Sequence, residues 1–267
     1  MNAKISASQT DVHALILAAG LGSRLEGLTS DRPKCLVEVA GRPMLERMLD
    51  ILSGERVASV TMAVGYMEER VRAFVDTLVA RGAISCPVRY VRNPDFRTTG
   101  SAASFALALD EVEPSGDLVL IEADVVIEAD LLSLLLSAMR ERGQSATLLA
   151  PYDPALSGSF ASVEAGRVTA WLHQSARAPE FDLTAAFKTI NLTAFRNADR
   201  PILSDTLKAA LSRYGPNVPL EYAMHDMVMA GMPIAAVLSG TRRWFEVDDA
   251  RDLAIAERMF ARTSAHA

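Results

Sequence analysis

Residues 15–25 read Leu15-Ile16-Leu17-Ala18-Ala19-Gly20-Leu21-Gly22-Ser23-Arg24-Leu25, an apolar run that opens into a turn of small residues. The apolar part predicts a buried strand, because it is short, aliphatic and followed by glycines. Glycines directly after a parallel strand let backbone N–H groups approach a phosphate, and small alanines let a flat base lie against the main chain. The stretch therefore predicts a strand of an α/β sheet with a nucleotide site at its carboxyl end.

Two better-known glycine motifs do not fit this loop. The dinucleotide-binding fingerprint needs a third glycine or alanine where this chain has Leu25, which disfavours a dehydrogenase. The P-loop pattern needs lysine followed by serine or threonine where this chain has Leu28 and Thr29. A different nucleotide-binding loop is the remaining interpretation.

Two cations bracket the loop. Arg24 lies inside it, and Lys34 follows Pro33 a few residues later. A site that binds a triphosphate must neutralise several negative charges, which guanidinium and ammonium groups can do. The fixed backbone of Pro33 could aim the ammonium of Lys34 back at the loop.

Further along the chain, apolar β-rich runs alternate with amphipathic stretches through the first 150 residues. This is the pattern of βαβ units and a mainly parallel sheet. A helix is expected to begin at Pro43, with an apolar face that includes Met44, Leu45 and Met48. We expect strands at His13–Ala19, Ala58–Val64, Val88–Arg92 and Leu118–Ala123, and further helices at Glu68–Ala80, Ser101–Leu109 and Ala129–Arg140.

The second half of the sequence has a different pattern of expected strands and helices. Residues 152–172 predict a hairpin around Ala165-Gly166. No internal repeat or flexible linker separates the halves, so we expect one domain over residues 1–267. It would contain a nucleotide-binding half (12–150), an acceptor-binding half (151–247) and a C-terminal helix (248–267). The expected elements are strands at Phe187–Phe195, Ile234–Leu238 and Trp244–Val247, and helices at Ile202–Arg213, Leu220–Ala230 and Ala250–Ala261.

The composition excludes several classes of protein. A net charge of −6 disfavours nucleic acid as a partner. The longest uncharged run, Met227–Thr241, is shorter than the roughly 20 apolar residues of a membrane span, so we expect no membrane partner. The segment Met1–Asp11 is polar and shows no signal peptide or lipidation motif. Two cysteines, Cys35 and Cys86, are too few for a disulfide framework, which indicates a cytoplasmic protein.

Carboxylates follow two of the expected strands. Asp124 comes after the apolar run 118–123, at the carboxyl end where open α/β sheets bind ligands. A late strand leads to Asp248 and Asp249 before a helix; Asp249 is a good helix N-cap, which leaves Asp248 to face inward. Phosphoryl-type transfer needs a divalent cation, and Mg²⁺ prefers carboxylate ligands. Taken alone, Asp124 could equally be a turn or cap residue.

The complete motif consists of Leu17-Ala18-Ala19-Gly20-x-Gly22-x-Arg24-Leu25, followed by Thr29, Pro33-Lys34 and Gly41-x-Pro43. This motif resembles the signature of nucleotidyltransferases that make nucleotide-activated sugars and phospho-alcohols. The resemblance implies a Rossmann-like α/β fold, with a mixed, mainly parallel sheet, helices on both faces and a small acceptor-binding β/α elaboration. It implies that Arg24 and Lys34 hold the phosphates of a nucleoside triphosphate, and that Mg²⁺ on Asp124 assists transfer of the nucleoside monophosphate with release of pyrophosphate. In choline-phosphate-type cytidylyltransferases a late Glu-x-Asp completes the metal site, which here is Asp248. The implied nucleotide-binding residues of the loop are Leu17, Ala18, Ala19, Gly20 and Gly22.

The segment 93–104 resembles the part of these enzymes that contacts the base, which makes Ser101 and Ala102 further nucleotide-binding candidates. In the cytidylyltransferase branch an asparagine commonly precedes the small residues, where this chain has Thr99-Gly100-Ser101. The base therefore stays open between cytosine, which is favoured, and uracil or another base. Ser101 could also be the N-cap of the helix that follows.

Two segments of the second half point to the acceptor. Lys188-Thr189-x-Asn191 resembles phosphonate-type and phosphocholine-type cytidylyltransferases, which implies acceptor-binding roles for Lys188 and Asn191. Glu221 and Tyr222 resemble the acidic and aromatic helix near the acceptor. An amine or quaternary ammonium would be bound by a carboxylate and aromatic faces, for which Tyr152 and Trp171 are also available.

These observations predict a Mg²⁺-dependent nucleotidyltransferase with Arg24, Lys34, Asp124 and Asp248 as its catalytic residues. The favoured reaction transfers CMP from CTP to a small phospho- or phosphono-alcohol or amine, such as phosphocholine or 2-aminoethylphosphonate. The alternatives are a sugar-1-phosphate nucleotidyltransferase using UTP or another nucleotide, and a non-catalytic nucleotide-binding domain. A domain that only binds a nucleotide would not need both Asp124 and Asp248. The sequence is also compatible with a homodimer.

Overall fold

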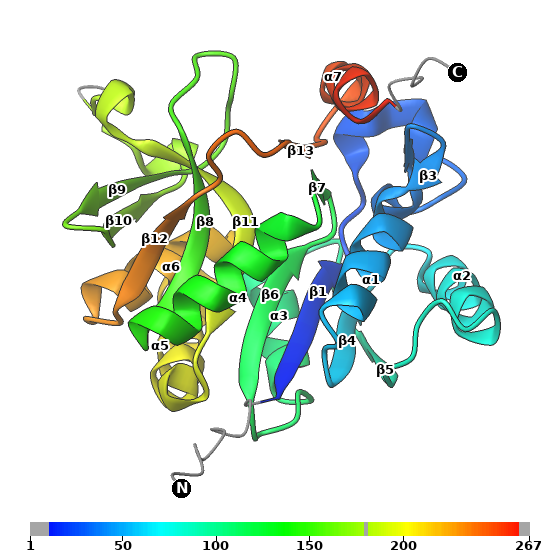
Figure 1. Cartoon of the computed structure of the whole chain (residues 1–267), viewed down its shortest axis with the longest axis horizontal. Helices are drawn as coiled ribbons and strands as arrows, with labels where there is room; N and C mark the ends of the chain where they lie inside the picture. The colour runs from blue at the N-terminus through cyan, green and yellow to red at the C-terminus, as the bar shows by residue number, and fades with distance from the viewer. Residues whose placement is uncertain (1–10, 179–180, 262–267) are drawn as a thin grey trace, which may run out of the picture.

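The computed structural model describes residues 11–178 and 181–261, and its centre is a mixed sheet with helices on both faces (Figure 1). The α/β fold expected from the sequence is therefore confirmed. The strands of this sheet, in spatial order, are β5 (Val88–Arg92), β4 (Ser59–Val64), β1 (Val12–Ala18), β6 (Asp117–Glu122), β11 (Phe187–Phe195), β8 (Ser145–Pro151), β12 (Ile234–Leu238), β10 (Arg167–Leu172) and β9 (Phe160–Glu164).

Strand β1 lies between β4 and β6 and is parallel to both. It is buried along its whole length, which explains why residues 12–18 form a continuous apolar run without alternation. Because β4, β1 and β6 run in the same direction, their carboxyl ends meet at one edge of the sheet. The glycine loop after β1 and Asp124 after β6 therefore lie at the same edge.

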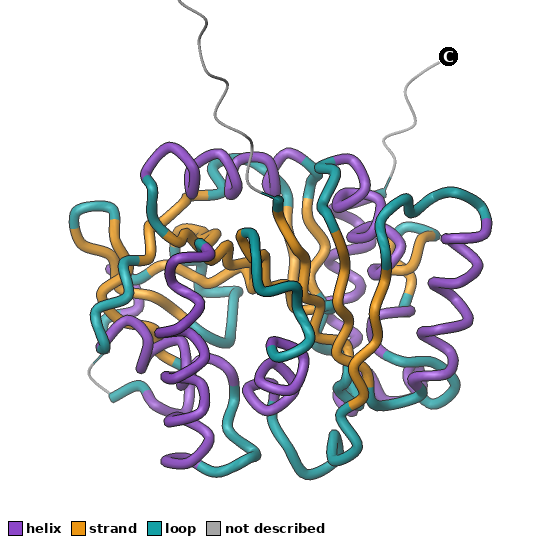
Figure 2. Tube along the Cα trace, turned by 90° about the horizontal axis from the view of Figure 1, so that it is seen from below, coloured by secondary structure: helices purple, strands orange, loops and turns teal. Residues whose placement is uncertain are grey.

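The helices form two layers, with the strands between them (Figure 2). Their amphipathic patterns explain this; in α2, for example, Val71, Val75 and Leu78 form one buried stripe. One layer consists of α1 (Met44–Gly54), α2 (Glu68–Ala80) and α4 (Asp130–Arg142), and the other of α3 (Ser101–Leu109), α5 (Arg200–Tyr214) and α6 (Leu220–Met229).

The second half of the chain extends the same sheet. The predicted hairpin is confirmed: β9 and β10 pair across Ala165 and Gly166, both of which have positive φ angles of 48° and 76°. Strand β9 also pairs with β11, so the hairpin joins the sheet rather than forming a separate unit. This continuity supports our proposal of one domain.

Four strands of the described residues were not predicted. Strand β8 is a buried run next to β11 and β12, and its apolar pattern does not distinguish a strand from the end of a helix. Strand β7 (Val125–Ile127) is too short to show any periodicity, and it pairs with β13 (Trp244–Glu246). Pro43 ends β3 (Arg42–Pro43), which pairs with β2 (Glu38–Val39), so α1 begins one residue later than predicted.

The remaining elements are short, apart from the last helix. Helix α7 (Ala250–Phe260) ends near the predicted residue; the rest of the predicted C-terminal segment and the polar residues 1–10 lie outside the described residues. Within the described ranges, no helix has both the length and the apolarity of a membrane span. The 3₁₀ helices are η1 (Ser23–Thr29), η2 (Lys34–Leu36), η3 (Gln174–Ala176), η4 (Leu183–Ala185) and η5 (Asn197–Asp199).

Candidate active site

The glycine loop is held in shape by Gly22. This residue has a left-handed φ of 64° and precedes η1. A Cβ atom at this position would lie 2.8 Å from Cβ of Lys34, so the close approach of the two segments also requires glycine. The hydroxyl of Thr29 donates a hydrogen bond to the Gly22 carbonyl, 3.1 Å away. The loop and Lys34 are thus fixed against each other.

A cavity of about 150 Å³ lies between this loop and the start of α3. Five of the predicted nucleotide-binding residues line it: Leu17, Ala18, Ala19, Gly20 and Ser101. The other two do not. Gly22 fixes the turn of the loop, and Ala102, the second residue of α3, is completely buried.

Ser101 is not the N-cap of α3, which is Gly100. A Cβ atom on Gly100 would lie only 2.2 Å from the Val218 carbonyl oxygen, so the chain comes too close for a side chain there. The Ser101 hydroxyl instead accepts a hydrogen bond from the backbone N–H of Leu220, at 2.8 Å. Through this bond it connects the glycine-loop cavity to α6.

Asn93 orders the segment that lines the far side of this cavity. It is buried, and its amide nitrogen donates to the hydroxyls of Thr99 and Ser104, at 2.9 Å each. Its amide oxygen accepts from the N–H of Asp95 at 3.0 Å. All three contacts are local, so the turn before α3 is held in one conformation.

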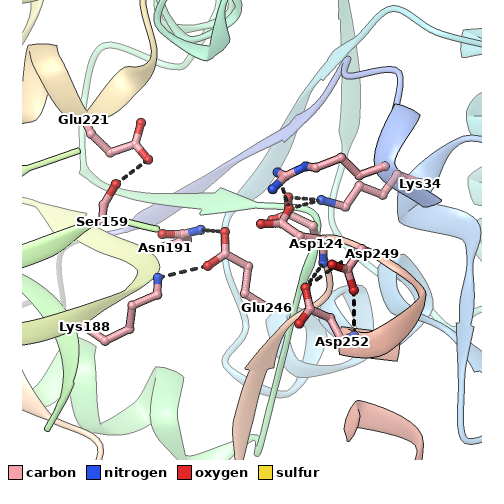
Figure 3. Close-up of polar contacts among 11 residues, drawn as sticks. Lys34, Asp124, Ser159, Lys188, Asn191, Glu221, Glu246, Asp249 and Asp252 are labelled. Atoms are coloured by element: carbon pink, nitrogen blue, oxygen red, sulfur yellow. Dashed lines mark hydrogen bonds and ion pairs between the residues drawn. The ribbon is translucent and has the colours of Figure 1, made fainter. Parts of the chain in front are cut away.

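The four predicted catalytic residues lie together, although they come from three distant parts of the chain. The Lys34 ammonium donates to Oδ2 of Asp124 at 2.7 Å and to Oδ1 of Asp248 at 2.8 Å. The Arg24 guanidinium forms an ion pair of 2.8 Å with the same oxygen of Asp248. Figure 3 shows Lys34 directed at Asp124.

These contacts determine the charge of each group. Burial alone would lower the pKa of Lys34, but the carboxylates of Asp124 and Asp248 outweigh it and raise that pKa above its ordinary value. Burial alone would raise the pKa of Asp248, but the Lys34 ammonium outweighs it and holds that pKa below its usual range. Lys34 and Asp248 are therefore both ionised at neutral pH.

Asp248 reaches Asp124 because β13 pairs with β7. In this ladder Glu246 lies opposite Val125, and the N–H of Val247 donates to the Asp124 carbonyl at 2.9 Å. Asp249 does cap α7, as predicted. Its carboxylate accepts from the N–H groups of Arg251 and Asp252, and a reciprocal capping box is present.

The acidic residues fit a divalent cation. Carboxylate oxygens of Asp124, Glu246 and Asp248 lie within 4.8 Å of one another. Oδ1 of Asp124 is buried and has no hydrogen-bond partner among the described residues, so it is free to bind an ion. Hard oxygen ligands of this kind suit Mg²⁺.

Glu246 is held by two predicted acceptor-side residues. Lys188 donates to one of its carboxylate oxygens at 2.9 Å, and Asn191 donates to the other at 3.0 Å (Figure 3). The pKa of Glu246 is raised, because its burial outweighs the opposite effect of Lys188. With both oxygens engaged, Glu246 is less available to a metal than Asp124 and Asp248 are.

The burial of Lys188 and the backbone conformation of Asn191 differ from what their sequence positions alone indicate. A lysine at a strand start is usually solvated, yet only 2% of Lys188 is exposed, and it also donates to the Thr189 carbonyl. Asn191 has a left-handed φ of 54° where the pairing of β11 with β8 shifts register. Such irregularities turn a side chain out of the strand's normal alternation.

The side chains of Glu221 and Tyr222 lie in different surroundings. Glu221 accepts a hydrogen bond from the Ser159 hydroxyl at 2.9 Å and lines a smaller cavity with Asn191. The Tyr222 hydroxyl is paired with Ser175, and its ring packs against His173 and Tyr214, outside the residues that line either cavity.

Glu122 was missed by the sequence analysis. It ends β6, two residues before Asp124, and lines both cavities. Its pKa is raised well above the ordinary value because it is buried and lies near the Glu221 carboxylate. The available signal was an acidic residue at the end of an otherwise apolar strand.

Comparisons with known proteins agree with this geometry. The MobA-like NTP transferase domain matches residues 14–187. CMP-5'-(3-aminopropyl)phosphonate synthase of Streptomyces rubellomurinus is 35% identical over 253 residues, which are 94% of this chain and 39% of that protein. The 2-aminoethylphosphonate cytidylyltransferase of Lancefieldella rimae is 33% identical over 115 residues, 43% of this chain and 44% of the relative. The chain thus spans less than half the length of these two relatives.

Among solved structures, the CTP:phosphocholine cytidylyltransferase of Streptococcus pneumoniae superposes with a TM-score of 0.72, over 93% of this chain and 98% of that one. The two sequences are 19% identical, so this match shows the shared fold. The fold and the glycine-loop cavity, with its cations and carboxylates, are those of an NTP transferase domain. The chain belongs to the MobA-like NTP transferase domain family, which confirms the resemblance read from residues 17–43.

Proposed function

We propose that this protein is a cytidylyltransferase that transfers CMP from CTP to a small phosphonate or phosphate acceptor and releases pyrophosphate. The observation that carries the proposal is that the nucleotide cavity opens directly onto the cluster of Lys34, Asp124 and Asp248. A nucleotide bound by the loop would have its phosphates beside both the cations and the carboxylates.

The proposed reaction is an in-line displacement. An acceptor oxygen forms a bond to the α-phosphorus of CTP, and the bond from that phosphorus to the pyrophosphate oxygen breaks. Since the acceptor is already ionised at neutral pH, no strong general base is required. Positioning and charge neutralisation supply the catalysis, with Arg24 and Lys34 at the phosphates. Asp124 and Asp248 would hold Mg²⁺, which would supply positive charge to neutralise the phosphates.

The acceptor side is formed by the second half of the chain. Lys188 and Asn191 bind Glu246, which lies beside the proposed metal ligands, and Glu221 lines the adjoining cavity. The names of the two relatives support a phosphonate acceptor, and that of the solved structure supports a small phosphorylated alcohol.

The test is an assay of pyrophosphate release with each of the four nucleoside triphosphates and Mg²⁺. The acceptors should include 2-aminoethylphosphonate, 3-aminopropylphosphonate, phosphocholine and glucose-1-phosphate. We expect turnover with CTP and a phosphonate or phosphocholine. Turnover only with UTP and the sugar phosphate would establish the alternative activity. Nucleotide binding by calorimetry without turnover on any acceptor would favour a non-catalytic domain.

A further inference from the structure

Asp252 lies in the first turn of α7 and binds the segment of chain that precedes the helix. Its Oδ2 atom accepts hydrogen bonds from two backbone N–H groups, that of Asp248 at 3.0 Å and that of Asp249 at 3.3 Å (Figure 3). Within residues 11–178 and 181–261, these are the only hydrogen bonds that its carboxylate accepts. One oxygen atom thus holds two consecutive residues.

This arrangement extends the capping box of α7. In a capping box the third residue of the helix reaches back to the backbone N–H of the N-cap, which here is Asp249. Asp252 makes that contact, yet its shorter bond goes to Asp248, the residue before the cap. The bond to Asp248 is therefore one that helix capping does not require.

The additional bond falls on a proposed metal ligand, Asp248. The neighbouring backbone is also fixed, because the N–H of Val247 donates to the carbonyl of Asp124, the other ligand, at 2.9 Å. Two consecutive N–H groups therefore tie this part of the chain to Asp124 and to Asp252. The first bond keeps the two ligands close together, and the second fixes the residue that carries the Asp248 carboxylate.

The side-chain contacts of Asp248 could not hold it as firmly. Its Oδ1 atom contacts the ends of two long side chains, Lys34 at 2.8 Å and Arg24 at 2.8 Å, and 66% of the Arg24 side chain is exposed. Long side chains of this kind keep much rotamer freedom. Both cations also have a proposed role at the phosphates of a nucleotide. The backbone bond to Asp252 does not depend on where these cations are.

Asp252 is placed to orient a ligand and not to be one. Among the described residues, the carboxylates that could hold an ion together are those of Asp124, Glu246 and Asp248. Asp252 lies outside this group and contacts it through the backbone of Asp248. Loss of such an outer partner typically lowers metal affinity by about 10–100-fold.

We propose that Asp252 is a positioning residue of the metal site, whose carboxylate oxygen holds the backbone of Asp248 and so aims the Asp248 carboxylate at an ion shared with Asp124. This inference rests on the proposed metal-dependent transfer and assigns a further residue to it. The role requires an oxygen acceptor and not the negative charge of Asp252. Asp249 has no such role, because its carboxylate binds N–H groups inside the helix.

The experiment measures binding of Mn²⁺, which takes the same oxygen ligands as Mg²⁺, from the electron paramagnetic resonance signal of the free ion. Asp252→Ala removes the acceptor and should weaken Mn²⁺ binding by at least ~10-fold. Asp252→Asn keeps an oxygen acceptor without the charge and should bind Mn²⁺ within about 3-fold of wild type. A second measurement is the Mg²⁺ concentration that gives half-maximal pyrophosphate release, which should rise in Asp252→Ala alone.

Asp249→Ala is the matched control, because it breaks the same capping box from the other side. Like Asp252→Ala, it should lower the melting temperature by about 2–8 °C. Its Mn²⁺ binding should nevertheless stay within about 3-fold of wild type, since it leaves the acceptor of the Asp248 N–H in place.

Unchanged Mn²⁺ binding in Asp252→Ala would overturn the inference, even if the protein transfers CMP as proposed. Equal losses in Asp252→Ala and Asp252→Asn would also overturn it, because charge would then matter and not position. An equal loss in Asp249→Ala would show a general effect of the helix end. Wild-type protein that binds no Mn²⁺ would reject the role together with the metal site. The expected pattern would support the role even if no CMP is transferred.

Discussion

Asp248 and Asp249 are neighbours in sequence with different surroundings. Asp248 contacts Arg24 and also Lys34, which lines the glycine-loop cavity, whereas Asp249 accepts from backbone N–H groups at the start of α7. Their roles separate because the chain turns from strand to helix at this point, which sends consecutive side chains to opposite sides. The pair therefore allows a matched test at the scale of single residues.

We expect Asp248→Asn to reduce the rate of nucleotidyl transfer by at least ~10²-fold with little change in stability, because it removes charge that acts on the transition state. Asp124→Asn should behave in the same way. Asp249→Ala should instead lower the free energy of unfolding by about 1–2 kcal/mol through loss of the cap, and keep most of the activity. Steady-state kinetics and urea denaturation measure the two effects. Near-normal turnover in Asp248→Asn would remove that residue from the metal site.

The two cysteines should differ in reactivity. Cys35 follows Lys34 and is buried, and this burial raises its pKa to about 12. The pKa of Cys86 is also raised by burial, but that residue is more exposed. We expect iodoacetamide at pH 8 to modify Cys86 first and Cys35 only on unfolding. Mass spectrometry of labelled peptides gives the order, and early labelling of Cys35 would contradict the buried position.

At the scale of elements, the loop between β1 and η1 combines three requirements in few residues. It must leave a buried parallel strand, turn with a left-handed residue at Gly22, and bring Arg24 and Lys34 to one side. The close contact of Gly22 with the stem of Lys34 makes these requirements interdependent. Backbone geometry and charge placement are thus parts of the same element.

Gly22→Ala tests this interdependence. The added Cβ would lie against the Lys34 side chain and would hold alanine in a left-handed conformation that costs about 1–2 kcal/mol. We expect a lower melting temperature and at least ~10-fold weaker binding of nucleoside triphosphate, measured by calorimetry. Gly27→Ala is the control, because a Cβ there meets no atom within 4 Å. Equal behaviour of the two variants would show that the contact is unimportant.

At the scale of the molecule, both halves of the chain share one sheet and both cores. Ile16 and Val237 belong to the same core cluster, and so do Leu15 and Ala236 in the cluster on the other face. The four predicted catalytic residues also come from both ends of the chain. The candidate active site therefore forms only when both halves of the chain are folded.

This architecture predicts a single unfolding transition. Circular dichroism and the fluorescence of Trp171 and Trp244 should give the same midpoint, because residues from both halves of the chain pack in the same core clusters. Two resolved transitions in a calorimetric scan would contradict the one-domain proposal.

Ligand and metal should stabilise this fold together. With CTP at 100 times its dissociation constant and Mg²⁺ present, the folded state should gain about 2.7 kcal/mol. Chelating the metal with EDTA should remove most of that gain, because Asp124 and Asp248 would then face the phosphates without a bridging cation. The change in melting temperature measures the effect. An equal shift with and without EDTA would argue against a metal shared by these residues.

Much of the site could be predicted because its signals are local. The glycine loop, the lysine after proline and the two strand-end aspartates each combine a backbone requirement with a chemical group. The predictions that the structure corrected lacked such a local signal. Ser101 is not a cap because the Val218 carbonyl, distant in sequence, comes so close that Gly100 must precede the helix. Glu122 was missed because its neighbours Glu221 and Trp171 lie far away in the chain.

The sequence by itself determined the α/β class, the first strand with its nucleotide loop, and the identity of the charged residues, because periodicity and turn chemistry act over a few residues. Only the tertiary structure decided which carboxylates face each other and which are left without a partner. The pairing of β7 with β13 brings Asp248 to Asp124. The register shift in β11 places Asn191 between Glu246 and the smaller cavity that Glu221 also lines. These contacts depend on pairing between strands that are far apart in the sequence, which no local sequence pattern predicts.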